Sequence, residues 1–121
     1  MQIRPVTGAD LDERIPATLG PAWSALRPHL SFYVGHPACH PIVAEANGIV
    51  VGVATGIQKG TVGWLGHIFV PPAGRRQGIG SALTRALIED LEGRGCRTLL
   101  LVASARDQPI YERLGFAVET T

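Results

Sequence analysis

The sequence predicts an α+β domain that spans residues 1–121 and holds a mixed, mostly antiparallel sheet with helices on both faces. Two observations lead to this fold class. Asn47-Gly48 separates two apolar segments rich in β-branched residues, a pattern typical of an antiparallel hairpin. Further along, an amphipathic helical pattern lies between two apolar strand patterns, which indicates a βαβ unit with one parallel join.

The N-terminal third is expected to hold one strand and two helices. Residues 3–6 have a strand pattern. Residues 11–19 and 22–30 have helical patterns, and Gly20-Pro21 separates them because this pair breaks a helix. Residues 31–41 contain a glycine and two prolines, so we expect an irregular connection there.

The rest of the chain holds the hairpin and the βαβ unit. Apolar residues recur at helical spacing between Gly78 and Glu92, which predicts a helix with one buried face. The nearly continuous apolar segment 98–102 is typical of a buried parallel strand. The other expected elements are strands at 42–46, 49–57 and 61–70, a short helix at 108–114, and a last strand at 116–120.

Composition argues against several classes of protein. The net charge of +1 gives no electrostatic basis for binding nucleic acid or an anionic membrane. No apolar segment approaches the roughly 20 residues that a membrane helix needs. The first residues lack a signal-peptide pattern, and two cysteines do not make a disulfide framework. We therefore expect a cytoplasmic protein with no membrane or nucleic-acid partner.

A basic, glycine-bearing loop is the most informative motif. An apolar segment ends at Val70, two prolines follow, and the loop Gly74-Arg75-Arg76-Gln77-Gly78-Ile79-Gly80 leads into the predicted helix. The free amides of a helix N-terminus attract anions, and two arginines add positive charge. Glycines let the backbone approach a ligand closely. The loop therefore indicates a phosphate site.

Three segments together resemble the GNAT superfamily of N-acetyltransferases. Arg75-x-x-Gly78-x-Gly80 resembles the family's acyl-CoA pyrophosphate loop, and the preceding residues 67–71 resemble its fourth strand. Residues 110–116 resemble its closing tyrosine motif. The resemblance implies an acetyl-CoA co-substrate, no metal, and direct acetyl transfer to a primary amine in a ternary complex. The acceptor would be a small molecule or a peptide.

The resemblance also assigns roles to individual residues. It implies that Tyr111 donates a proton to the CoA sulfur, and that the Val70 amide faces the thioester oxygen. Ser104 stands where many members have an asparagine that contacts the CoA arm. The implied CoA-binding residues are Ile68, Phe69, Val70, Arg75, Arg76, Gln77, Gly78, Ile79, Gly80, Ser81 and Ser104.

The general base is not identified by the sequence. Some family members use a glutamate where this chain has Leu99, which cannot accept a proton. His67, on the strand that leads to the loop, titrates in a suitable range. Glu45 on an earlier strand is another candidate. A water relay to bulk solvent would also serve.

The segment between Trp23 and His40 occupies the place where the family builds its acceptor pocket. Trp23, Phe32, Tyr33 and His36 are therefore candidate lining residues, although Trp23 and Phe32 are expected to be core residues. His36, Cys39 and His40 also lie close together in the sequence. Zinc needs three or four convergent ligands, and no second ligand pair follows, so we expect no metal site.

The end of the chain departs from the family pattern. Family members usually continue through a last strand, and this chain ends five residues after Phe116. The last strand is therefore expected to be missing or very short, or to be supplied by a partner, and an unpaired sheet edge favours a homodimer. An alternative to catalysis is a non-catalytic acyl-CoA-binding or regulatory domain on the same scaffold. A third alternative is an incomplete domain that only dimerises or docks.

Overall fold

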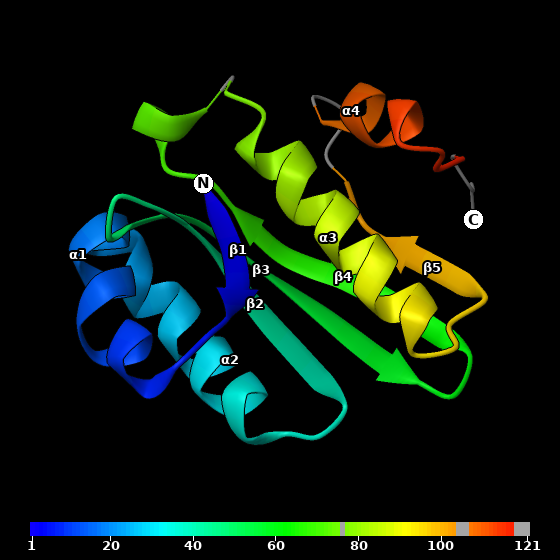
Figure 1. Cartoon of the computed structure of the whole chain (residues 1–121), viewed down its shortest axis with the longest axis horizontal. Helices are drawn as coiled ribbons and strands as arrows, with labels where there is room; N and C mark the ends of the chain where they lie inside the picture. Colours follow the sequence, from blue (N-terminus) through cyan, green and yellow to red (C-terminus); the bar gives the residue numbers. More distant parts are fainter. Residues whose placement is uncertain (76, 104–106, 118–121) are drawn as a thin grey trace.

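A computed structural model describes residues 1–75, 77–103 and 107–117, and within them it forms one open sheet with helices on both faces (Figure 1). The strands lie in the order β1-β2-β3-β4-β5. They are β1 (Gln2–Pro5), β2 (Cys39–Ala46), β3 (Ile49–Lys59), β4 (Val62–Phe69) and β5 (Thr98–Leu101).

Strand pairing follows the predicted mixed pattern. The pairs from β1 to β4 are antiparallel, and β4 pairs with β5 in parallel. At the β2–β3 hairpin both Asn47 and Gly48 have positive φ, at 53° and 79°. Asparagine and glycine tolerate that backbone region better than other residues, which is why this dipeptide makes the turn. The predicted α+β fold class is confirmed.

The helices divide between the two faces of the sheet. One face carries α1 (Ile15–Leu19) and α2 (Trp23–Gly35), and the other carries α3 (Ile79–Gly93). Alternation along each strand sends neighbouring residues to opposite cores. The core beneath α1 and α2 includes Ile15, Leu30, Val43 and Val53, whereas the core beneath α3 includes Ala44, Ala54, Leu83, Leu87 and Leu91.

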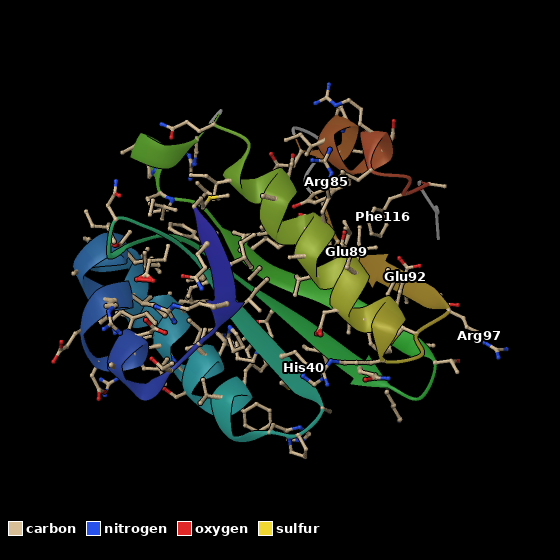
Figure 2. The ribbon with its side chains drawn as sticks, in the orientation of Figure 1. His40, Arg85, Glu89, Glu92, Arg97 and Phe116 are labelled. Carbon is tan, nitrogen blue, oxygen red and sulfur yellow. The ribbon has the colours of Figure 1, made fainter. Side chains whose placement is uncertain are left out.

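The short helix α4 (Gln108–Arg113) follows β5 and lies beside α3 (Figure 1). Phe116, after α4, packs against the core beneath α3. Figure 2 shows Arg85, Glu89 and Glu92 along the side of α3 that faces α4 and β5. These three charged residues are exposed, as expected from the amphipathic pattern.

Two boundaries differ from the sequence prediction. Residues 31–35 belong to α2, because Leu30 and Tyr33 continue its buried stripe and hold the last turns in place. Strand β2 begins at Cys39 and includes Pro41. The carbonyl of Pro41 accepts the Val6 amide just past the end of β1, so the missing amide of the proline removes no ladder bond there.

The predicted last strand lies partly beyond the described residues. Phe116 and Ala117 are described and are not in a strand, and positions 118–121 lie outside the description. Among the described residues, no helix combines the length and the apolar character that crossing a membrane requires.

Candidate functional site

The pairing of β4 with both of its neighbours becomes irregular toward the end of the strand. Its register with β3 shifts by one residue between the pairs Thr55–Gly66 and Val53–Phe69, so a bulge lies in β4 between Gly66 and Phe69. On the other side, the pairing with β5 stops at Leu65.

A cavity of about 690 Å³ opens beside this strand end, between β4, the start of α3, and α4. Most of the residues proposed from the sequence for CoA binding contribute to its walls. The residues that line it are Ile68, Phe69, Val70, Gly74, Arg75, Gly78, Ile79, Gly80, Ser81, Asp107, Ile110, Tyr111 and Arg113. The βαβ unit places the loop on one side of the cavity, and α4, which follows the unit, places the closing motif on the other side.

The wall at the start of α3 presents backbone amides. Gly78 precedes the helix with φ +77°, a left-handed conformation that favours glycine. The Ala82 amide is bonded to the Gly78 carbonyl, so the amides of Ile79 to Ser81 precede the first intrahelical bond. The first turn of α3 contains no acidic residue. This end of the cavity is therefore suited to an anion.

Arg75 reinforces the positive character of the same wall. Its Nε donates to the Val70 carbonyl at 3.1 Å, which ties the loop to the end of β4. Gln77 donates its side-chain amide to the Ala73 carbonyl at 3.3 Å and does not line the cavity. Arg76 lies outside the described residues.

Tyr111 forms part of the opposite wall, on α4. Its ring meets Phe116 edge-on, with 6.3 Å between ring centroids, which holds the tyrosine against a partly buried phenylalanine. Burial raises the pKa of the Tyr111 phenol, and the charge of Asp107 raises it further. The phenol therefore stays protonated at neutral pH and can donate a proton into the cavity.

The proposed base residues have different surroundings. The side chain of His67 lies outside the description, and its backbone lies in the β4 bulge. Glu45 accepts a bond from Arg4 Nε at 3.1 Å and does not line the cavity. Leu99 packs against the core beneath α3. Ser104, proposed to contact the CoA arm, is also outside the described residues.

The histidine and cysteine cluster does not converge. Cys39 is buried beneath α2, while His40, the next residue on β2, lies near the C-terminal end of α3 (Figure 2). Burial lowers the pKa of His40, and the charge of Arg94 lowers it further. The two side chains point to opposite faces because residues alternate along a strand. No group of metal ligands is found among the described residues.

The candidate acceptor residues on α2 also separate. Trp23 packs against the core, as expected, and Tyr33 is buried within it. The expectation that Phe32 is a core residue is wrong, because its side chain is 60% exposed. Leu30 and Tyr33 are three residues apart and share the buried face of α2, and the helical period turns Phe32 outward.

Four cavity residues were not identified from the sequence: Gly74, Asp107, Ile110 and Arg113. Asp107 precedes Tyr111 by four positions, and residues at this spacing share one side of a helix. That spacing was therefore a usable signal. Arg113 lies in the segment 110–116 that resembles the closing motif, but no local pattern gave its side chain a role, because only the packing of α4 opposite α3 places it at the cavity.

Comparison with known proteins identifies the family of the chain. Residues 9–116 match the model of the Acetyltransferase (GNAT) family, so the chain belongs to that family. A relative by sequence is the glucosamine 6-phosphate N-acetyltransferase of Trypanosoma brucei brucei, 38% identical over 55 residues. That match covers 46% of this chain and only 37% of the relative.

Solved structures show the same fold. An acetyltransferase from Trypanosoma brucei is similar with a TM-score of 0.80 and 24% identity, covering 99% of this chain and 94% of the other. The glucosamine-6-phosphate N-acetyltransferase of Arabidopsis thaliana has a TM-score of 0.82 and 15% identity, covering 99% and 93%. The aminoglycoside N-acetyltransferase AAC(6')-Iy, solved with CoA, has a TM-score of 0.78 and 22% identity, covering 99% and 94%.

Proposed function

We propose that this protein is an acetyl-CoA-dependent N-acetyltransferase that acts by direct transfer in a ternary complex. The observation that supports this most strongly is the single cavity that joins the loop before α3 to Tyr111 on α4. Membership of the GNAT family and the likeness to an aminoglycoside N-acetyltransferase solved with CoA support the same function. Acetyl-CoA would be a co-substrate, and the acceptor would be a primary amine.

The pyrophosphate of CoA would bind at the start of α3. The amides of Ile79 to Ser81 would donate to phosphate oxygens, and Arg75 would supply charge. Arg113 lies on the facing wall and is a second cation for the same ligand. The pantetheine arm would then follow the β4 backbone at Ile68 and Phe69.

The acetyl group would react beside Val70 and Tyr111. The amine nitrogen attacks the thioester carbonyl carbon, and the Val70 amide stabilises the negative charge on the oxygen. When the tetrahedral intermediate collapses, the carbon–sulfur bond breaks and the Tyr111 hydroxyl donates its proton to the sulfur. The amine loses its own proton to His67 or to a chain of water molecules, and solvent reprotonates the phenolate.

Calorimetry with acetyl-CoA tests the binding half of the proposal. We expect micromolar binding, and we expect Arg75→Ala to weaken it by about tenfold, because one charge-assisted phosphate contact is lost. Arg97→Ala is the matched control, since it removes the same charge from an exposed position outside the cavity. Absence of binding in the unaltered protein would contradict the proposal.

The change Tyr111→Phe tests the chemical half. It keeps the ring contact with Phe116 and removes only the hydroxyl. We expect kcat to fall by 10²-fold or more, the usual range for a positioned acid, while acetyl-CoA affinity stays nearly constant. Because the pKa of Tyr111 is raised above its usual value of 10.0, the rate should not decline through this group below about pH 10. Normal turnover by the variant would remove Tyr111 from the mechanism.

The same pair of experiments distinguishes the alternative function. A non-catalytic acyl-CoA-binding or regulatory domain would bind acetyl-CoA with the same dependence on Arg75 and would acetylate no amine. Tyr111→Phe would then change no measured property of the complex.

A further inference from the structure

The segment that joins β4 to α3 is short and closed by its own hydrogen bonds (Figure 1). It contains a 3-10 turn over Pro72–Gly74, in which the Gly74 amide donates to the Pro71 carbonyl at 2.9 Å. The Arg75 amide donates to the Pro72 carbonyl at 3.3 Å. This turn brings Arg75 back to Val70, which lies five positions earlier in the chain.

Val70 is held by this segment at its carbonyl and at its side chain. Arg75 Nε donates to the Val70 carbonyl at 3.1 Å. A Cβ built on Gly74 would lie 3.3 Å from Val70 Cγ1, and one built on Gly80 would lie 3.8 Å from Val70 Cγ2. The valine side chain therefore fits between the loop and the first turn of α3, where two glycines leave room for it.

The backbone amide of Val70 has a different environment from its carbonyl. Val70 directly follows the last residue of β4, and among the residues that the structure describes its amide donates to no carbonyl. Val70 also lines the cavity. In the proposed reaction this amide stabilises the charge on the thioester oxygen, and such a donor is effective only when it is held in place before the charge develops. Contacts that position Val70 therefore affect the chemistry.

The guanidinium of Arg75 can hold the Val70 carbonyl and a phosphate at the same time. Its Nε donates to the carbonyl, and the terminal nitrogens of the same rigid plane carry further N–H donors that suit phosphate oxygens. Arg75 and Val70 both line the cavity. A pyrophosphate bound to the terminal nitrogens would fix the plane, and with it the direction of the Nε–H toward Val70.

The exposure of Arg75 gives this second contact a purpose. The side chain is exposed, so in the free protein its bond to Val70 competes with bonds to water. A bound phosphate would remove much of the rotamer freedom of the arginine and so favour that bond. Occupancy of the phosphate site would thus restrain the end of β4.

We propose that Arg75 is a positioning residue that couples binding of the CoA pyrophosphate to the position of the Val70 amide. The phosphate end of the co-substrate thereby orders the place where its thioester end reacts, which uses binding energy far from the reacting bond. This inference rests on the proposed acetyltransferase function and goes beyond it. An arginine that only bound phosphate would change the affinity for acetyl-CoA and leave the bound thioester unaltered.

Infrared difference spectroscopy with acetyl-CoA labelled with carbon-13 at the acetyl carbonyl tests the coupling and needs no acceptor. A hydrogen bond to the thioester oxygen lowers the carbonyl stretching frequency, so we expect a shift to lower frequency on binding to the unaltered protein. Arg75→Lys keeps the charge but lacks the planar group that reaches phosphate and Val70 together. With the ligand fully bound, Arg75→Lys and Arg75→Ala should each lose more than half of the shift.

Arg113→Ala is the matched control, because it removes a cation of the same cavity from the facing wall. It should weaken acetyl-CoA binding and, with the ligand fully bound, keep the whole shift. The inference is overturned if either Arg75 variant keeps the shift, if Arg113→Ala also loses it, or if the bound thioester shows no shift in the unaltered protein. Absence of acetyl-CoA binding to the unaltered protein would instead contradict the proposed function itself.

Discussion

At the scale of single residues, Asp10 is a charged side chain that depends on its hydrogen-bond partners. Its carboxylate is fully buried and accepts bonds from two nitrogens of Arg4, at 2.7 and 2.9 Å. The amide and hydroxyl of Thr7 donate to the same carboxylate, at 2.8 and 3.0 Å. These contacts, above all those of Arg4, hold the pKa of Asp10 well below its usual range. These hydrogen bonds join strand β1, through Arg4, to the helical turn that contains Asp10.

Removing the charge of Asp10 is expected to destabilise the protein. Asp10→Asn leaves Arg4 without its principal partner, and breaking a buried ion pair in this way costs about 3 kcal/mol. Urea unfolding measures the loss, and Asp12→Asn, an exposed carboxylate on the same turn, is the control. A loss below about 0.5 kcal/mol would mean that the buried pair contributes no stability.

The pH dependence of the same change has a definite sign. Because the pKa of Asp10 is lower in the folded state, its contribution is present above the unfolded value of about 3.9 and is lost as pH falls through the folded value. The difference in stability between the unaltered protein and Asp10→Asn should therefore be constant from pH 7 to pH 5 and should shrink below pH 4.

At the scale of elements, the distance between α3 and the sheet depends on a glycine in β3. A Cβ on Gly52 would lie 2.9 Å from Leu83 Cδ1 and 3.1 Å from Ile79 Cγ2. Both neighbours are buried residues of α3, and Ile79 also lines the cavity proposed to bind CoA. The absent side chain lets the start of α3 approach the strand closely and so sets the position of the amides that we propose to bind phosphate.

Gly52→Ala should therefore affect both stability and ligand binding. The added methyl group forces Leu83 and Ile79 to move, and overpacking of this kind costs about 1–3 kcal/mol. Thermal unfolding measures that cost, and calorimetry should show weaker acetyl-CoA binding as well. Gly35→Ala, where the new methyl group would meet no atom within 4 Å, should change neither property. Equal stability of Gly52→Ala and the unaltered protein would contradict the close packing.

At the scale of the whole molecule, the sheet has an unpaired side at β5. Among the described residues β5 pairs only with β4, and a groove of about 940 Å³ runs along its free edge between α3 and α4. Unpaired strand edges pair readily with a second chain. This geometry supports the prediction of a homodimer formed at β5.

Sedimentation velocity tests that prediction. We expect a dimer at micromolar concentration, and we expect Thr98→Lys to shift the protein toward monomer, because lysine on an edge strand opposes pairing. Thr61→Lys, just outside the strands, is a control that adds the same charge. A monomer in the unaltered protein would contradict the prediction.

The order of elements and the basic glycine loop could be predicted from the sequence alone. The Asn47-Gly48 turn, the amphipathic face of α3 and the basic glycine loop are local features, since each depends on residues that are neighbours in the chain. Local backbone preference and hydrophobic periodicity are sufficient to predict such features. The family assignment followed from the glycine loop together with residues 67–71 and 110–116, and comparison with known proteins confirmed it.

Only the tertiary structure decided which distant side chains meet. Strand β2 begins at Cys39, so alternation along it sends Cys39 and His40 to opposite faces, and the packing of α2 buries Tyr33 and exposes Phe32. The cavity acquires Asp107 and Arg113 because α4 lies opposite the start of α3. These outcomes depend on strand register and on helix placement across the sheet. Both are set by long-range packing, which no local pattern in the sequence records.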